Sequence, residues 1–182
     1  MSSRRSIPAL SLVAVASVLA GCTAGEPARA ADRVDCSETT TELRTAMADK
    51  PVFSAASAHP KLSVLVSLMA EAEMAKALDT ARNLTLFAPT DAAFAAADPN
   101  AMAAVRADKR KIANLVSHHI TGVVPQPANG SPAALQTLRG TSLDVTADGA
   151  GLRVDQAKAP CASVEIAGGT IYLIDSVLFP PP

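Results

Sequence analysis

The chain is poor in aromatic residues and in charge of either sign. Aromatic residues make up 3% of it, with no Trp and one Tyr, and charged residues make up 18% with a formal net charge of −1. Few aromatics argue against a surface on which sugars or unpaired bases stack, and balanced charge argues against nucleic-acid binding. The hydrophobic fraction of 49% in 182 residues excludes a disordered chain and predicts one domain.

The chain also lacks a long hydrophobic run, apart from a short one at its start. Arg4 and Arg5 precede an apolar segment over 7–20, which is shorter than the roughly 20 residues that a membrane-spanning helix needs. It predicts an export signal over residues 1–21. The segment ends in Leu19–Cys22 (LAGC), which resembles the lipobox of bacterial lipoproteins. In that class the cysteine thiol takes a diacylglyceryl group and the signal is cut before it. We therefore expect lipidation of Cys22, the alternative being a free cysteine on an uncleaved segment.

The stretch after the lipobox predicts a spacer between membrane and domain. Residues 22–35 are small, polar and charged and include Pro27, which favours a flexible tether. Two acyl chains suffice for stable anchoring. We expect a domain over residues 36–182, held by lipid at the cell membrane on its extracytoplasmic face, with shedding or secretion as a further expectation.

Two cysteines remain in the predicted domain, Cys36 and Cys161. Export places them in an oxidising compartment, where an even pair suggests a disulfide, stabilising by roughly 4–5 kcal/mol in the chain-entropy model. The alternative is two separate buried thiols. A metal site is less favoured because no Cys-x-x-Cys or Cys-x-x-His spacing occurs, and we expect no metal and no cofactor.

The first half of the domain has the signals of helices. Capping residues and apolar positions at helical spacing predict helices over 39–48, 51–58, 61–71 and about 74–78, a strand over 84–88, and a helix from Thr90 to Ala97. Asn100 and Asp108 are the next candidate N-caps, and the latter opens a helix that runs through His119.

The second half alternates between apolar and polar residues. The alternation covers 143–145, 152–154, 164–166 and 171–173, with turn sequences at 148–151 and 168–169. It predicts an antiparallel meander, and with the helical first half it gives an α+β fold class.

Three separated segments resemble the fasciclin domain. They are 84–94 (LTLFAPTDAAF), 115–120 (LVSHHI) and 170–181 (TIYLIDSVLFPP). With the lipobox, the tether and the two cysteines, the chain is similar to the single-domain fasciclin lipoproteins of mycobacteria and related actinobacteria. The resemblance implies a wedge-shaped β-sandwich flanked by helices, used for cell adhesion and extracellular interaction rather than catalysis. His118 stands where this family usually has the tyrosine of a Tyr-His pair.

The histidine pair His118-His119 is the main candidate motif for a structural or interaction role. A metal would need a further ligand, and no helical His-x-x-x-His spacing is present. His119 falls on an apolar helical stripe, so we expect a buried, neutral ring with a lowered pKa that bonds to Thr90 or Asp91. His118 is rotated about 100° from that stripe and should lie on its flank.

Two functions remain open. The first is a lipid-anchored surface module that binds an unknown protein or polysaccharide partner outside the cell. The alternative is an envelope lipoprotein that binds a small apolar or polysaccharide ligand. No nucleophile turn or other catalytic motif supports an enzyme. The basic run 109–111, with Arg106 one turn earlier, is interpreted as a solvated face rather than a patch for an acidic partner.

Overall fold

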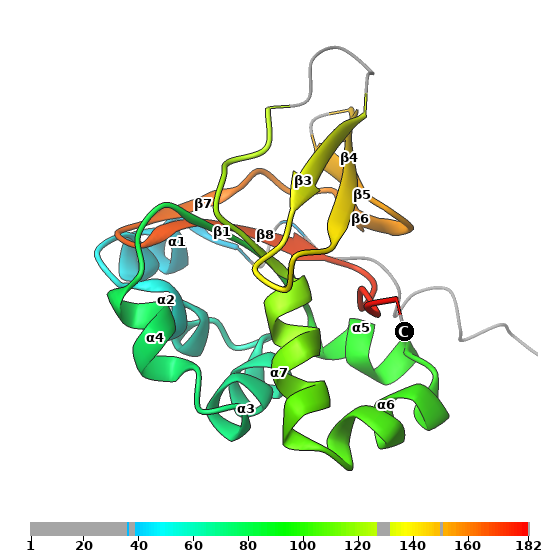
Figure 1. The fold of residues 1–182 in the computed structure, drawn as a ribbon. Helices are drawn as coiled ribbons and strands as arrows, with labels where there is room; N and C mark the ends of the chain where they lie inside the picture. Colours follow the sequence, from blue (N-terminus) through cyan, green and yellow to red (C-terminus); the bar gives the residue numbers. More distant parts are fainter. Residues whose placement is uncertain (1–35, 37–38, 127–131, 150, 182) are drawn as a thin grey trace, which may run out of the picture.

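The structure is a computed structural model that describes residue 36 and residues 39–126, 132–149 and 151–181. The predicted export signal (1–21), Cys22 and the tether (22–35) lie outside the described residues. Helices form the lower part of the molecule and two sheets lie above them (Figure 1). This arrangement confirms the α+β class.

The described chain forms helices almost entirely before residue 119 and strands mostly after it. The helices are α1 (Thr41–Ala48), α2 (Val52–Ala58), α3 (Ser63–Glu71), α4 (Ala75–Thr80), α5 (Asp91–Ala96), α6 (Pro99–Arg106) and α7 (Lys109–His118). The strands are β1 (Leu84–Pro89), β2 (Ile120–Thr121), β3 (Ala133–Gln136), β4 (Ser142–Asp148), β5 (Gly151–Val154), β6 (Ala157–Ala159), β7 (Val164–Ile166) and β8 (Gly169–Ile174).

Polar side chains begin four of the helices. Thr40, Thr90, Asp98 and Asp108 accept hydrogen bonds from backbone N–H groups in the first turns of α1, α5, α6 and α7. The prediction of Asn100 as an N-cap is wrong by two residues. Asp98 takes that position because Pro99 follows it, and proline suits the first helical residue, whose N–H has no partner inside the helix.

The strands form two sheets rather than one meander. The first sheet has the order β2-β1-β8-β7, and the second has β3-β4-β5-β6. The predicted antiparallel pairing is correct within the second sheet and for the β7–β8 hairpin. The meander does not continue from one sheet to the other, and β8 also runs parallel to β1, from Leu84↔Gly169 to Pro89↔Ile174. Gly169 begins this pairing with φ +148°, and a Cβ there would collide with the Leu84 carbonyl. A glycine is therefore required at the start of β8.

The first sheet lies between the helices and the second sheet. Every residue of β1 is buried. Leu84 and Leu86 join the apolar core formed with the helices, whereas Phe87 joins the core shared with the second sheet. Burial on both faces explains why β1 reads as an almost continuous apolar run.

A disulfide closes the domain. Cys36, at the start of the described chain, is bonded to Cys161, with 5.3 Å between their Cα atoms. It joins the segment before α1 to the segment before β7. In the part of the chain that the structure describes, no helix is long and apolar enough to cross a membrane.

Candidate functional site

His119 lies where α7 ends and connects three parts of the fold. Its Nδ1 is 2.8 Å from the Leu115 carbonyl oxygen, and its Nε2 accepts a hydrogen bond of 3.1 Å from the backbone N–H of Leu178. Its own carbonyl accepts a bond of 2.9 Å from the N–H of Phe87 in β1. The predicted bond to Thr90 or Asp91 is wrong, because the C-terminal segment and the preceding helical turn take both ring nitrogens.

These contacts set the protonation state of His119. A carbonyl oxygen can only accept, so Nδ1 carries the proton, and Nε2 must be unprotonated to accept from Leu178. Burial of the ring lowers the pKa of His119 to about 4, against the smaller opposing effect of the bond to Leu115. The ring is therefore neutral at physiological pH, and each nitrogen has a partner.

His118 is buried beneath the turn that joins β3 to β4. Only 2% of it is exposed, and its Nδ1 is 2.6 Å from the Thr141 hydroxyl oxygen, which is 2.8 Å from that of Thr137. The sequence predicted that His118 lies on the flank of the helical stripe. It did not reveal the β3–β4 turn, which covers the ring. The pKa of His118 is lowered, mainly because the ring is buried. The negative charge of Asp155 opposes this effect, and the positive charge of Arg139 adds to it.

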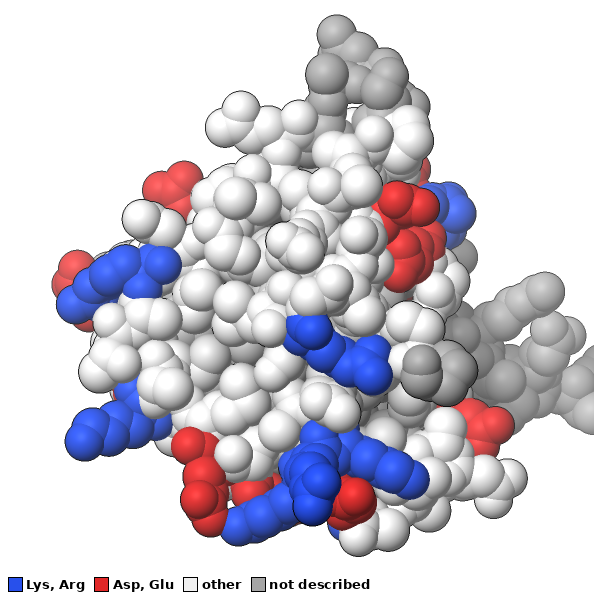
Figure 2. All heavy atoms as spheres, in the orientation of Figure 1, with Lys and Arg blue, Asp and Glu red and all other residues white. Residues whose placement is uncertain are grey.

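The turn over His118 carries an exposed apolar residue. Leu138 is 50% exposed, while its backbone N–H donates 2.8 Å to the Ile120 carbonyl. A β-bridge between Thr121 and Thr137 holds the segment after β2 beside this turn, and that segment contributes Val123 and Val124, which are 52% and 46% exposed. We call Val123, Val124 and Leu138 the apolar surface patch. Figure 2 shows no charged side chain over the upper central part of this face, where β3 and the segment after β2 lie.

Thr90 and Asp91 lie elsewhere, where α5 meets α3. Asp91 accepts 2.7 Å from the Ser63 hydroxyl and 2.9 Å from the N–H of Val64, and its own N–H donates 2.8 Å to the Lys61 carbonyl. Thr90 caps α5. The four candidate residues therefore form two separate sets. Within the described residues, no three His, Cys, Asp or Glu side chains converge as metal ligands.

Comparison with known proteins identifies the family. Residues 60–180 match the model of the Fasciclin domain. The chain belongs to the fasciclin domain family. It is 32% identical over 140 residues to Immunogenic protein MPB70 of Mycobacterium bovis, covering 74% of this chain and 72% of that protein. It is 31% identical to Cell surface glycolipoprotein MPB83 of the same organism, of which it spans 63%.

A solved structure has the same fold. The FAS1 domain pair from the insect cell adhesion molecule Fasciclin I superimposes with a TM-score of 0.55 at 16% identity, covering 73% of this chain and 52% of that one. The match confirms the fasciclin fold suggested by the three sequence segments. The apolar surface patch was missed from sequence, because Val123 and Val124 follow a two-residue strand that is too short for alternation to reveal.

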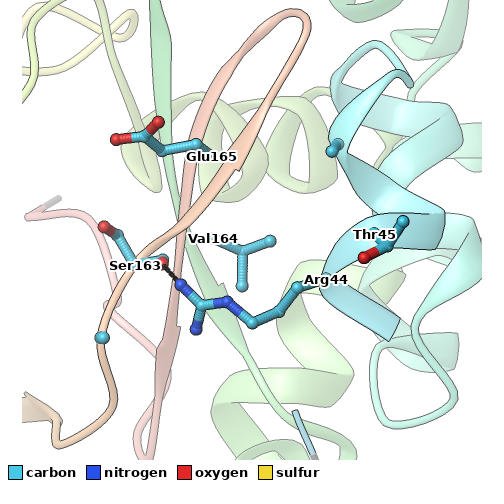
Figure 3. A pocket seen from close by; sticks show the side chains of 7 residues that line it. Arg44, Thr45, Ser163, Val164 and Glu165 are labelled. Carbon is cyan, nitrogen blue, oxygen red and sulfur yellow. Dashed lines mark hydrogen bonds between the residues drawn. The ribbon is translucent and has the colours of Figure 1, made fainter. Parts of the chain in front are cut away.

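A cleft of about 370 Å³ lies at the edge of the first sheet in this fasciclin domain, between α1 and β7. Figure 3 shows Arg44 extending from α1 to the Ser163 carbonyl, to which it donates 2.6 Å, while Glu165 points away from the guanidinium. The contact holds α1 along the edge of β7. Ser163 is two residues after Cys161 of the disulfide. An edge covered in this way is a poor template for pairing with another chain.

Proposed function

We propose that this protein is a lipid-anchored, non-enzymatic cell-surface fasciclin-domain protein that mediates adhesion or another extracellular interaction through the apolar surface patch. The partner is a protein or polysaccharide outside the cell. The observation that carries the proposal is the rigid support of the patch. Val123, Val124 and Leu138 are exposed large hydrophobic residues. Hydrogen bonds from the Leu138 N–H to the Ile120 carbonyl and from the Thr121 hydroxyl to the Val123 carbonyl fix the backbone at two of them.

The support comes from His118 and from β2. The His118–Thr141–Thr137 contacts hold the turn that presents Leu138, and the bond from Leu138 to Ile120 aligns that turn with β2. Because His118 is buried, it contributes to binding by holding the turn rather than by touching a partner. A surface whose backbone is already held in place loses less conformational entropy on binding than a flexible loop does.

The proposed lipid anchor increases the overall strength with which the patch binds a partner. Three exposed apolar side chains make a weak single contact, but many copies held on one membrane bind with avidity. The LAGC lipobox at Cys22 supports the anchor, as does the likeness to a relative described as a cell surface glycolipoprotein. The disulfide at Cys36 fixes the far end of the proposed tether to the domain.

Adhesion of bacterial cells that produce the full chain tests both parts of the proposal. We expect such cells to be retained on surfaces coated with matrix proteins or polysaccharides. The Cys22→Ser protein should leave the envelope for the medium, and its cells should not be retained. A Val123→Ser/Leu138→Ser protein should stay on the cell while retention is lost, because the apolar contact is removed.

Ala104→Ser is the matched control, since it adds a hydroxyl to an exposed position of α6. Its cells should adhere like those with the unchanged chain. Equal retention of cells with and without the two patch substitutions would exclude the patch, and cells that adhere to no coated surface would exclude adhesion.

A further inference from the structure

A second cleft, of about 300 Å³, lies between α7 and the C-terminal tail. Its lining comes from α6, α7, the β3–β4 turn and the tail, and consists of Val105, Lys111, Asn114, Arg139, Phe179, Pro180 and Pro181. It is separate from both the histidine pair and the Arg44 cleft. Its volume is at the lower end of the range for small-molecule sites, roughly 300–1,000 Å³.

The cleft has an apolar floor and a basic wall. Val105, Phe179 and Pro180 present carbon atoms only. Lys111 and Asn114 are three residues apart on α7 and so lie on the same helix face. Arg139 reaches in from the β3–β4 turn and donates 3.0 Å from Nη1 to the Pro181 carbonyl, which fixes the tail as part of the wall.

Neither positive charge has an acidic partner among the described residues of the cleft. No acidic side chain is among its lining residues. The salt bridges of the described residues are Lys109–Glu73 and Arg153–Asp148, which involve neither Lys111 nor Arg139. The basic run 109–111 is therefore divided in its roles, because Lys109 has an acidic partner whereas Lys111 lines the cleft. Figure 2 shows basic side chains gathered over the lower part of α7 on this face.

We propose that this cleft binds a small amphipathic anion, an acidic head group on an apolar body. The head lies between Lys111 and Arg139, where two cations and the Asn114 amide offer hydrogen-bond donors. The body lies against Phe179 and Pro180. A medium-chain fatty acid such as decanoate has this chemistry. This activity goes beyond adhesion through the apolar surface patch. Because Arg139 follows Leu138 of that patch in the same turn, the test substitutes Lys111 instead.

A matched pair of fluorescent probes tests the proposal. The dye 8-anilinonaphthalene-1-sulfonate has a sulfonate on an apolar body, and N-phenyl-1-naphthylamine has the same body without charge. Both are titrated into the full chain carrying Cys22→Ser, which prevents lipidation. Lys111→Gln is the test variant, and Arg110→Gln is the control because it removes the same charge from the adjacent exposed position of α7.

We expect Lys111→Gln to weaken sulfonate binding about fivefold or more, and Arg110→Gln to change it by less than about twofold. Neither variant should alter binding of the neutral probe, and decanoate should displace the sulfonate. Equal effects of the two variants on sulfonate binding, or failure of decanoate to displace it, would overturn the proposal. Urea midpoints of both variants verify that the fold is intact, since both side chains are exposed.

Discussion

His119 illustrates how one residue can join three parts of a fold while its side chain carries no charge. Its ring joins the end of α7 to Leu178, and its carbonyl joins α7 to β1. A protonated ring would carry an N–H at Nε2 that faces the N–H of Leu178. Protonation would therefore break the contact between the ring and the C-terminal segment, and would also place a charge among apolar neighbours.

The stability of the domain should consequently decrease with acidification. The pKa of His119 is about 4 in the folded chain, against 6.5 when the ring is free. Well above pH 6.5 the His119 ring is neutral in both the folded and the unfolded chain, so its protonation does not reduce the free energy of unfolding. Between pH 6.5 and 4 the unfolded chain binds a proton that the folded chain does not, which costs about 3 kcal/mol over the whole interval. Urea unfolding at pH 7.5, 6 and 5 measures this loss.

The His119→Gln variant isolates this contribution from the other titrating groups. It should be less stable than the unchanged chain at pH 7.5, and the gap should narrow towards pH 5, because glutamine does not titrate and His118 is present in both proteins. Parallel stability curves for the two proteins would contradict the role of His119.

At this scale, the sequence predicted the state of His119 but not its partners. The helical stripe of α7 shows that the ring points inward, and burial implies a neutral form. Leu178 is 59 residues further along the chain, and only the closed fold brings it to the ring. For the same reason the β3–β4 turn over His118 could not be expected from local spacing.

At the scale of secondary structure elements, two helices are capped by side chains from other parts of the chain. Pro51 and Leu62, at the N-caps of α2 and α3, provide no side-chain hydrogen bond. Asp79 accepts bonds of 2.9 and 3.0 Å from the N–H groups of Phe53 and Ser54, and Asp91 serves α3 in the same way. These carboxylates satisfy the free N–H groups of each first turn and join separate helices.

Removing either carboxylate should therefore destabilise the domain by more than a surface substitution does. We expect Asp79→Ala and Asp91→Ala each to lower the free energy of unfolding by about 1–2 kcal/mol, as for loss of an N-cap. Urea unfolding gives the values. Asp49→Ala is the control, because Asp49 is exposed at the end of α1 and its side chain has no hydrogen bond in the described part of the structure. A loss as small as that of the control would show that water replaces the caps.

Most elements and the β4–β5 and β7–β8 hairpins were predictable, whereas the pairing between distant strands was not. The helical spacing of 61–71 and the capping threonines mark α3, α1 and α5. β3 and β6 were missed, because these strands have four and three residues and their apolar positions are mostly alanine, which does not favour strands. The parallel pairing of β1 with β8 depends on residues more than eighty positions apart, so no local pattern reveals it.

At the scale of the whole molecule, the disulfide should contribute strongly to stability. Cys36 and Cys161 are 125 residues apart, and such a cross-link restricts nearly the whole unfolded domain. The chain-entropy model gives about 4–5 kcal/mol. We expect this decrease in the free energy of unfolding for the Cys36→Ser/Cys161→Ser variant, measured with urea.

The unchanged chain treated with a reductant should unfold at the same urea concentration as the double variant. The reductant should have no effect on that variant, which serves as the control. A loss below about 1 kcal/mol would mean that the unfolded chain is already compact without the cross-link.

The parallel pairing of β1 with β8 also determines when this protein is able to fold. β8 begins more than eighty residues after the start of β1, and it lies between β1 and β7 in the first sheet. A growing polypeptide therefore cannot assemble its first sheet until β8 has been synthesised, and distant pairing of this kind forms slowly. Such a delay would suit the export that we propose for this chain, since a translocation channel accepts a polypeptide that has not yet acquired its native structure.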